Sequence, residues 1–66
     1  MKTFTYRQAI SVLERYFHGF VILHVWDTIE QLDIVFKDAT GKEWELISTG
    51  DDYFQTVEDY MIIENN

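Results

Sequence analysis

The chain has 66 residues, no cysteine and a formal net charge of −7, with 17% aromatic and 47% apolar residues. The lack of cysteine excludes disulfides and a thiolate metal site. The aromatic and apolar fractions argue for a folded core and against disorder. A chain of this length forms one domain, residues 1–66, which buries only about 60% of the surface that its unfolded form exposes. A dense core or a binding partner must then supply the stability that disulfides or metals give to other small domains.

The acidic charge is concentrated in the last third of the chain. Residues 1–42 hold five acids and all five bases, whereas residues 43–66 hold seven acids and no base. Such charge repels nucleic acid and anionic membranes and attracts basic protein surfaces. No apolar run approaches the ~20 residues of a membrane span, and the N-terminus lacks the apolar segment of a signal peptide. We therefore expect a cytoplasmic protein without direct nucleic-acid or membrane binding.

The first element predicted is a helix over residues 6–18. Thr5 and Gln8 form a capping-box pattern, in which each side chain reaches the backbone amide of the other. Apolar residues follow at helical spacing from Tyr6 to Phe17. Gly19 then stands where a helix commonly needs a left-handed residue after its C-terminus.

The longest apolar run, residues 20–26, predicts a strand because β-branched and aromatic residues dominate it. Strict alternation places Phe20, Ile22, His24 and Trp26 on one face and Val21, Leu23 and Val25 on the other. Both faces then need cover, so we expect a central strand or one that a partner chain covers.

A hairpin is predicted next, from strands at residues 31–37 and 42–48 joined by a turn at Asp38–Gly41. Leu32, Ile34 and Phe36 share one face of the first strand, and Trp44 and Leu46 share one face of the second. These two rows form the core side of an antiparallel meander with the first helix on one face. The opposite face carries mainly charged residues, together with Val35 and Ile47.

The C-terminal segment is ambiguous. Apolar residues from Tyr53 to Met61 follow helical spacing, which favours a helix that begins at Asp52 or Val57 and ends at Ile63. Residues 60–63 also have strand character, and a strand there could lie beside residues 20–26. The expected fold is α+β with the order helix, three strands and short helix, the last segment being a strand in the alternative.

The search for chemistry finds no catalytic, metal or cofactor site. Nucleophilic catalysis needs a nucleophile beside an oriented base, and no serine has a histidine at a suitable spacing. The two histidines lie six residues apart on different predicted elements, which is no zinc pattern. His24 with nearby acids in a dimer cleft is the alternative hypothesis for a small ligand-binding or catalytic domain.

Surface recognition is the leading hypothesis, with two candidate sites. In the first, acids and aromatic anchors would bind a partner with a basic surface; these residues are Trp26, Glu43, Glu45, Asp51, Asp52, Tyr53, Phe54, Glu58 and Asp59. A sharper version is an inhibitor whose carboxylates mimic nucleic-acid phosphates, a type common among phage-encoded proteins. An uncovered aliphatic patch would mark an interface with a second copy or a foreign protein; this dimer patch comprises Val21, Leu23, Val25, Val35 and Ile47.

Overall fold

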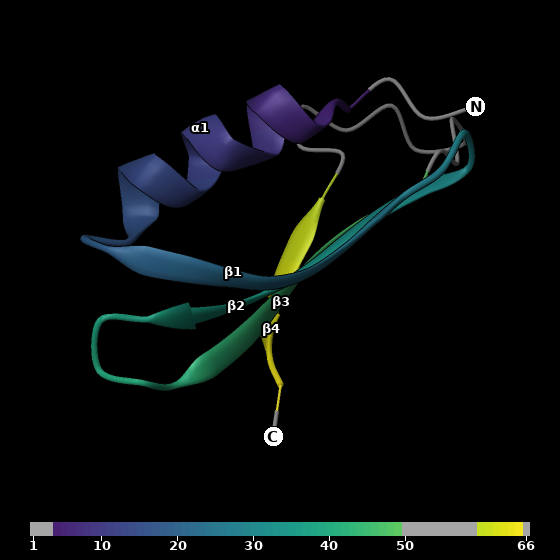
Figure 1. Ribbon diagram of the computed structural model, residues 1–66. Coiled ribbons are helices and arrows are strands. Elements are labelled where there is room, and N and C mark those ends of the chain that lie inside the picture. Colours follow the sequence, from purple (N-terminus) through teal and green to yellow (C-terminus); the bar gives the residue numbers. More distant parts are fainter. Residues whose placement is uncertain (1–3, 50–59, 66) are drawn as a thin grey trace.

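The computed structural model describes residues 4–49 and 60–65 as one helix on an antiparallel sheet. The helix α1 (Tyr6–Tyr16) is followed by β1 (Phe20–Asp27), β2 (Gln31–Asp38), β3 (Glu43–Thr49) and β4 (Met61–Glu64). The strands are hydrogen-bonded in the order β1-β2-β3-β4. Figure 1 shows α1 lying across one face of the sheet. The predicted α+β class is confirmed.

Helix α1 begins where the sequence predicts. The backbone N–H of Gln8 donates to the Thr5 hydroxyl at 3.2 Å, and the backbone N–H of Thr5 donates to Gln8 Oε1 at 2.8 Å. The helix ends at Tyr16, two residues earlier than expected, because Phe17 is extended with φ −128° and ψ 128°. The Phe17 ring packs against Phe36 at 5.0 Å between centroids, and this sheet contact competes with a longer helix.

The core lies between α1 and one face of the sheet. Its fully or almost fully buried apolar residues are Ala9, Val12 and Leu13 of the helix and Leu32, Ile34, Phe36 and Leu46 of the central strands. Burial in β2 alternates from residue to residue, which is the period of a strand with one packed face. The core side predicted for the hairpin is confirmed.

The register of the β2–β3 hairpin follows from its turn. Phe36 lies opposite Trp44 and Ile34 opposite Leu46. The backbone N–H of Gly41 donates to the carbonyl oxygen of Asp38 at 3.0 Å. Gly41 has φ +89°, a left-handed conformation that side-chain-bearing residues rarely adopt.

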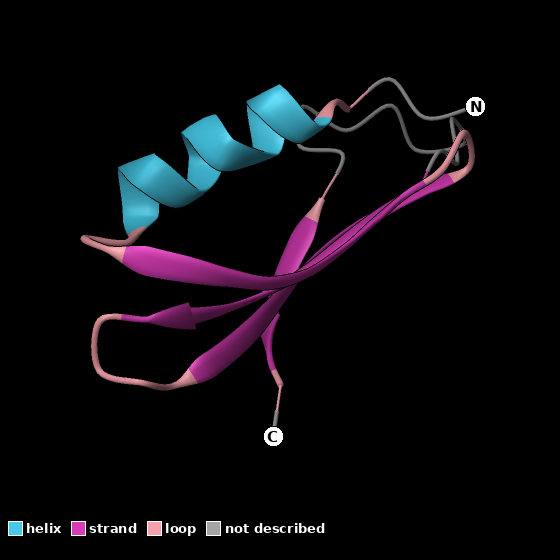
Figure 2. Ribbon diagram, viewed as in Figure 1, coloured by secondary structure: helices cyan, strands magenta, loops and turns pink. Residues whose placement is uncertain are grey.

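The C-terminal helix prediction is wrong where the structure can be compared with it. Met61–Glu64 is the strand β4, and the earlier part of the predicted helix, before residue 60, lies outside the described residues. Figure 2 shows this last strand in magenta. β4 pairs with β3, with Ile62 opposite the buried Leu46, because Ile62 on a strand can add to the core beneath α1.

Strand β1 is an edge strand, so the first of the two expectations for it, a central strand, is wrong. Its only strand neighbour in the described sheet is β2, since β4 joins the opposite edge. The register shifts between Ile22 and His24, so a β-bulge at Leu23 interrupts the alternation. Bulges of this kind twist exposed edges and hinder pairing with other chains.

For the residues of β1 that follow the bulge, the two faces of the strand are exchanged relative to strict alternation. Val25 lies opposite the buried Ile34, whereas Trp26 lies opposite Asp33. Residues opposite one another in an antiparallel pair share a face. Val25 therefore belongs to the helix side, and Trp26 turns to the other side, the reverse of what strict alternation predicts.

Among the described residues, α1 is neither long enough nor apolar enough to cross a membrane.

Candidate functional site

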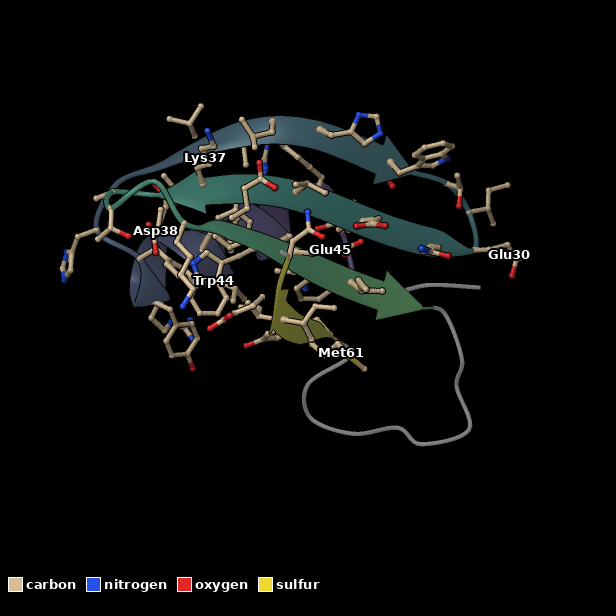
Figure 3. All side chains as sticks on the ribbon, turned by 90° about the horizontal axis from the view of Figure 1, so that it is seen from below. Glu30, Lys37, Asp38, Trp44, Glu45 and Met61 are labelled. Carbon is tan, nitrogen blue, oxygen red and sulfur yellow. The ribbon has the colours of Figure 1, made fainter. Side chains whose placement is uncertain are left out.

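The sheet face opposite α1 is uncovered by any other described element, and we call it the open face. Figure 3 views the sheet from this side, with Lys37, Glu45 and Met61 labelled and the helix behind the strands. The strand register assigns to it Val21, His24 and Trp26 of β1, Asp33, Val35 and Lys37 of β2, Glu43, Glu45 and Ile47 of β3, and Met61 and Ile63 of β4.

Large apolar side chains of the open face remain in solvent. The exposed fraction is 63% for Val21, 62% for Trp26, 59% for Met61 and 41% for Ile63. These four residues come from the two edge strands, β1 and β4, and so border the face on both sides. Exposed apolar side chains that gather on one face of a protein are typical of an interaction site.

Trp26 is held by its neighbours at the end of β1. Its ring stands edge-to-face with that of His24, with 5.3 Å between ring centroids. The loop that follows is fixed by the Thr28 hydroxyl, which accepts from the backbone N–H groups of Glu30 and Gln31 at 3.2 and 3.0 Å. The indole is thus presented on an ordered hairpin.

Two carboxyl groups, Asp33 and Glu45, lie near the middle of the open face, and we call them the acid pair. Glu45 is opposite Val35, two residues along β2 from Asp33, so the two acids are diagonal neighbours across adjacent strands. A hydrogen bond to Asp33, partial burial and the charge of Asp33 all raise the pKa of Glu45. Both side chains are half-buried.

One oxygen of the acid pair is buried without a hydrogen-bond donor from any described residue. Asp33 Oδ1 is shielded from solvent and has no N–H or O–H donor among the described residues. No ion pair joins either acid to a base in the described part of the chain, whereas the Lys42 ammonium pairs with Glu64 at 2.6 Å outside the open face.

Asp38, in the β2–β3 turn, is the most strongly hydrogen-bonded acid described. Its Oδ1 accepts from the Thr40 hydroxyl at 2.6 Å and from the backbone N–H groups of Thr40 and Lys42 at 2.9 and 3.0 Å. Its Oδ2 accepts from Trp44 Nε1 at 2.9 Å. The hydrogen bonds from the Thr40 and Trp44 side chains hold the pKa of Asp38 far below its ordinary value of 3.8. Asp38 is therefore a turn anchor and is not available as a ligand.

We predict that Asp38→Ala destabilises the fold near neutral pH and flattens its acid unfolding. A carboxyl whose pKa is depressed on folding stabilises the protein above its unfolded pKa, and that stability is lost as pH falls through the folded value. Thermal unfolding measured from about pH 7 down to about pH 2 should therefore show a steeper loss below about pH 4 in wild type than in the variant. Glu30→Ala, in the exposed β1–β2 loop, is the control and should keep the wild-type profile.

The structure brings together some of the partner-binding residues that the sequence predicts. Trp26, Glu43 and Glu45 share the open face. The remaining members lie outside the described residues: Asp51, Asp52, Tyr53, Phe54, Glu58 and Asp59.

The residues of the predicted dimer patch do not all share one face. Val21, Val35 and Ile47 lie on the open face, Leu23 occupies the bulge, and Val25 faces the helix side opposite Ile34. Trp44, interpreted from sequence as structural, is half-buried and packs against the core.

Sequence reasoning missed three members of the site. Hydrophobic periodicity alone does not pair Asp33 with Glu45. The register set by the Asp38–Gly41 turn is the signal that makes the two acids diagonal neighbours. Helical spacing places Met61 and Ile63 in the predicted C-terminal helix, and no local signal places them on the open face. Their position follows from pairing with β3.

The described residues offer no cluster of three or more His, Asp or Glu side chains that could hold a metal ion. His24 lies exposed on the open face beside Trp26. The arrangement around it is that of a sheet surface lined with apolar and acidic groups.

Comparison of the chain with protein-family models, curated proteins and solved structures finds no match, so the function is argued from the open face itself.

Proposed function

We propose that this chain is a non-enzymatic protein-interaction module that docks the open face of its sheet onto a partner with a basic surface. The observation that carries the proposal is the exposure of Val21, Trp26, Met61 and Ile63 on a sheet face that no described element covers. Aromatic and Met side chains are enriched at interfaces, and the sheet presents Trp26 and Met61 in one row through Asp33 and Ile47.

Charge selects the kind of partner. The open face has three acids, Asp33, Glu43 and Glu45, against one base, Lys37, and the whole chain has a net charge of −7. A second copy would bring two such charges together, whereas a basic surface is attracted from a distance. The complex should therefore weaken as salt rises.

An inhibitor that mimics nucleic-acid phosphates is the sharper form of this proposal. Its carboxylates would occupy the basic groove of a nucleic-acid-binding protein. Glu43 and Glu45 are the members of that acid set within the described residues, and they lie two residues apart on the same face of β3. Competition between nucleic acid and this chain for the partner would support that form.

The test is capture of basic proteins by variants of the open face. Val21→Gln/Met61→Gln removes apolar side chains from both edge strands without a change of charge. Tyr16→Gln, at a helix residue that is 57% exposed, is the matched control. We expect the double variant to lose at least about tenfold in affinity for a partner that wild type retains, and the control to bind normally.

Two results would contradict the proposal. Equal affinity of the double variant and wild type would remove the open face from the interface. The second result is a wild-type protein that is dimeric at micromolar concentration and low salt, with a double variant that is monomeric. It would mean that the open face binds a second copy of the chain.

A further inference from the structure

We propose, building on the function above, that the partner adds an extended segment of basic sequence as a fifth strand along the outer edge of β1, beside residues 24–27. The proposal concerns how the partner is held at the margin of the open face. It rests on the backbone pattern of β1, on the exposure of its side chains and on the charge around the β1–β2 loop.

The backbone of β1 turns alternate residues away from the sheet. The backbone N–H of Thr28 donates to the carbonyl oxygen of Gln31 at 2.8 Å, so these two residues form a hydrogen-bonded pair of the β1–β2 hairpin. Hydrogen-bonded pairs alternate with non-hydrogen-bonded pairs along an antiparallel ladder. Trp26 and His24 therefore direct their backbone groups to β2. Val25, between them, directs its N–H and C=O to the outer edge.

The outer edge of β1 has no strand neighbour among the described residues. β2 is the single described partner of β1, and β4 joins the far side of the sheet. Figure 3 shows β1 bordering the sheet. An extended segment along this edge gives the N–H and C=O of Val25 a partner, which is the strand-addition mode of peptide recognition. The backbone therefore favours an extended occupant over a helical one, whose N–H and C=O groups are bonded internally.

Apolar side chains are exposed on both sides of the same edge. Val25 faces the helix side but remains 37% exposed, so α1 does not cover it fully. Trp26, the next residue, faces the open face and is 62% exposed. An added strand removes part of both side chains from water, and on the side of Trp26 it is continuous with the open face.

The bulge at Leu23 sets the length of the added strand. Pairing is interrupted there, so the regular edge is residues 24–27, which span about 13 Å at ~3.3 Å per residue. Pairing of β1 with β1 of a second copy is disfavoured, because both strands carry the bulge and each chain has a net charge of −7. A short segment of another protein needs only the edge on one side of the bulge.

Charge selects a basic segment. Asp27 ends β1, Glu30 lies in the β1–β2 loop and Asp33 lies opposite Trp26, whereas residues 16–36 contain no lysine or arginine. Cationic side chains of an added strand are attracted to this end of the sheet, and acidic ones are repelled.

The test uses the peptide N-acetyl-Lys-Val-Thr-Val-Lys-amide and the same peptide with N-methyl groups on its threonine and second valine. Adjacent residues of a strand direct their N–H groups to opposite edges, so the two methyl groups block both edges and leave the charge unchanged. Amide hydrogen exchange of ¹⁵N-labelled protein is followed by NMR as each peptide is added to millimolar concentration. In the free protein, the N–H of Val25 should exchange faster than that of Trp26.

We expect the unmodified peptide to slow exchange at Val25 about tenfold when about nine-tenths of the protein is bound, because exchange then proceeds from the free tenth. The rate at Trp26, whose N–H already bonds to β2, should not change. The N-methylated peptide should bind at least about tenfold more weakly.

A pair of variants at Val25 tests the edge from the side of the protein. Val25→Pro removes the outward N–H and keeps the bonds to β2, because an edge strand tolerates proline where its N–H faces outward. It should weaken peptide binding at least about tenfold. Val25→Thr keeps the N–H and the β-branched shape and should bind like wild type. If Val25→Pro does not fold, the N-methylated peptide provides the same comparison on the wild-type chain.

Three results would overturn the added strand: equal binding of the two peptides, no slowing at Val25 with millimolar peptide, or normal binding by a folded Val25→Pro. Slowing at Val25 that grows with protein concentration in the absence of peptide would assign the edge to a second copy. The proposed function is decided separately, by the capture experiment with Val21→Gln/Met61→Gln.

Discussion

Phe36→Ala is expected to remove a large part, or all, of the free energy of unfolding at room temperature. Phe36 is fully buried, and its ring contacts Phe17 and Phe20 edge-on at 5.0 and 6.1 Å between centroids. Removing such a ring costs about 3–5 kcal/mol. A domain of this size has a total stability of only about 3–10 kcal/mol at typical per-residue values. Circular dichroism with urea titration should show a lost or strongly shifted transition.

Val35→Ala is the matched control for that experiment. Val35 is the neighbouring residue on β2 but points to the open face and is half-buried. We expect it to cost about 1 kcal/mol, the typical value for a point substitution. A loss as large as that of Phe36→Ala would mean that the open face is packed under a cover in the free protein.

Trp26→Ala is expected to weaken partner binding by at least about 30-fold, which corresponds to ~2 kcal/mol, the usual threshold of an interface hot spot. The indole is 62% exposed and lies opposite Asp33 on the open face, so it is available to a partner and adjacent to the acid pair. Its truncation should leave the free energy of unfolding within about 0.5 kcal/mol, as for other surface substitutions.

Titration calorimetry against the captured partner measures this effect, and Tyr16→Ala is the control. Tyr16 is an aromatic residue of similar exposure at the end of α1, away from the open face. Its loss should leave the affinity unchanged. Identical affinities of Trp26→Ala and wild type would exclude the indole from the interface.

Local signals in the sequence were sufficient for the helix start and the hairpin. The capping box of Thr5 and Gln8 acts between residues three apart, and the Asp38–Gly41 turn sets the register of the strands on either side of it. Both features are determined by short-range chemistry, so a single sequence predicts them. The end of α1 is different, because the ring of Phe17 packs against Phe36 and Trp44, which are distant in sequence.

The edge position of β1 and its bulge could not be predicted from the run of residues 20–26. Every residue in that run except His24 is apolar, so no polar residue marks where the alternation shifts. The bulge at Leu23 is visible only in the pairing with β2. It changes which residues line the open face, replacing Val25 by Trp26.

The helix prediction for the C-terminal segment is wrong for a related reason. A helical stripe and a strand-forming run overlap in residues 60–63, and local propensity does not decide between them. Pairing with β3 decides for the strand and places Ile62 against the core and Met61 on the open face. The candidate site thus depends on one long-range pairing that periodicity alone cannot reveal.

The proposed function requires the open face to be in contact with solvent in the free protein. Methyl NMR with a soluble gadolinium chelate tests it directly, because the chelate broadens signals of exposed methyl groups. We predict strong broadening for Val21, Met61 and Ile63 and protection for the buried Leu13 and Leu32. If Val21, Met61 and Ile63 were as protected as Leu13 and Leu32, the open face would already be covered and could not be a free docking surface.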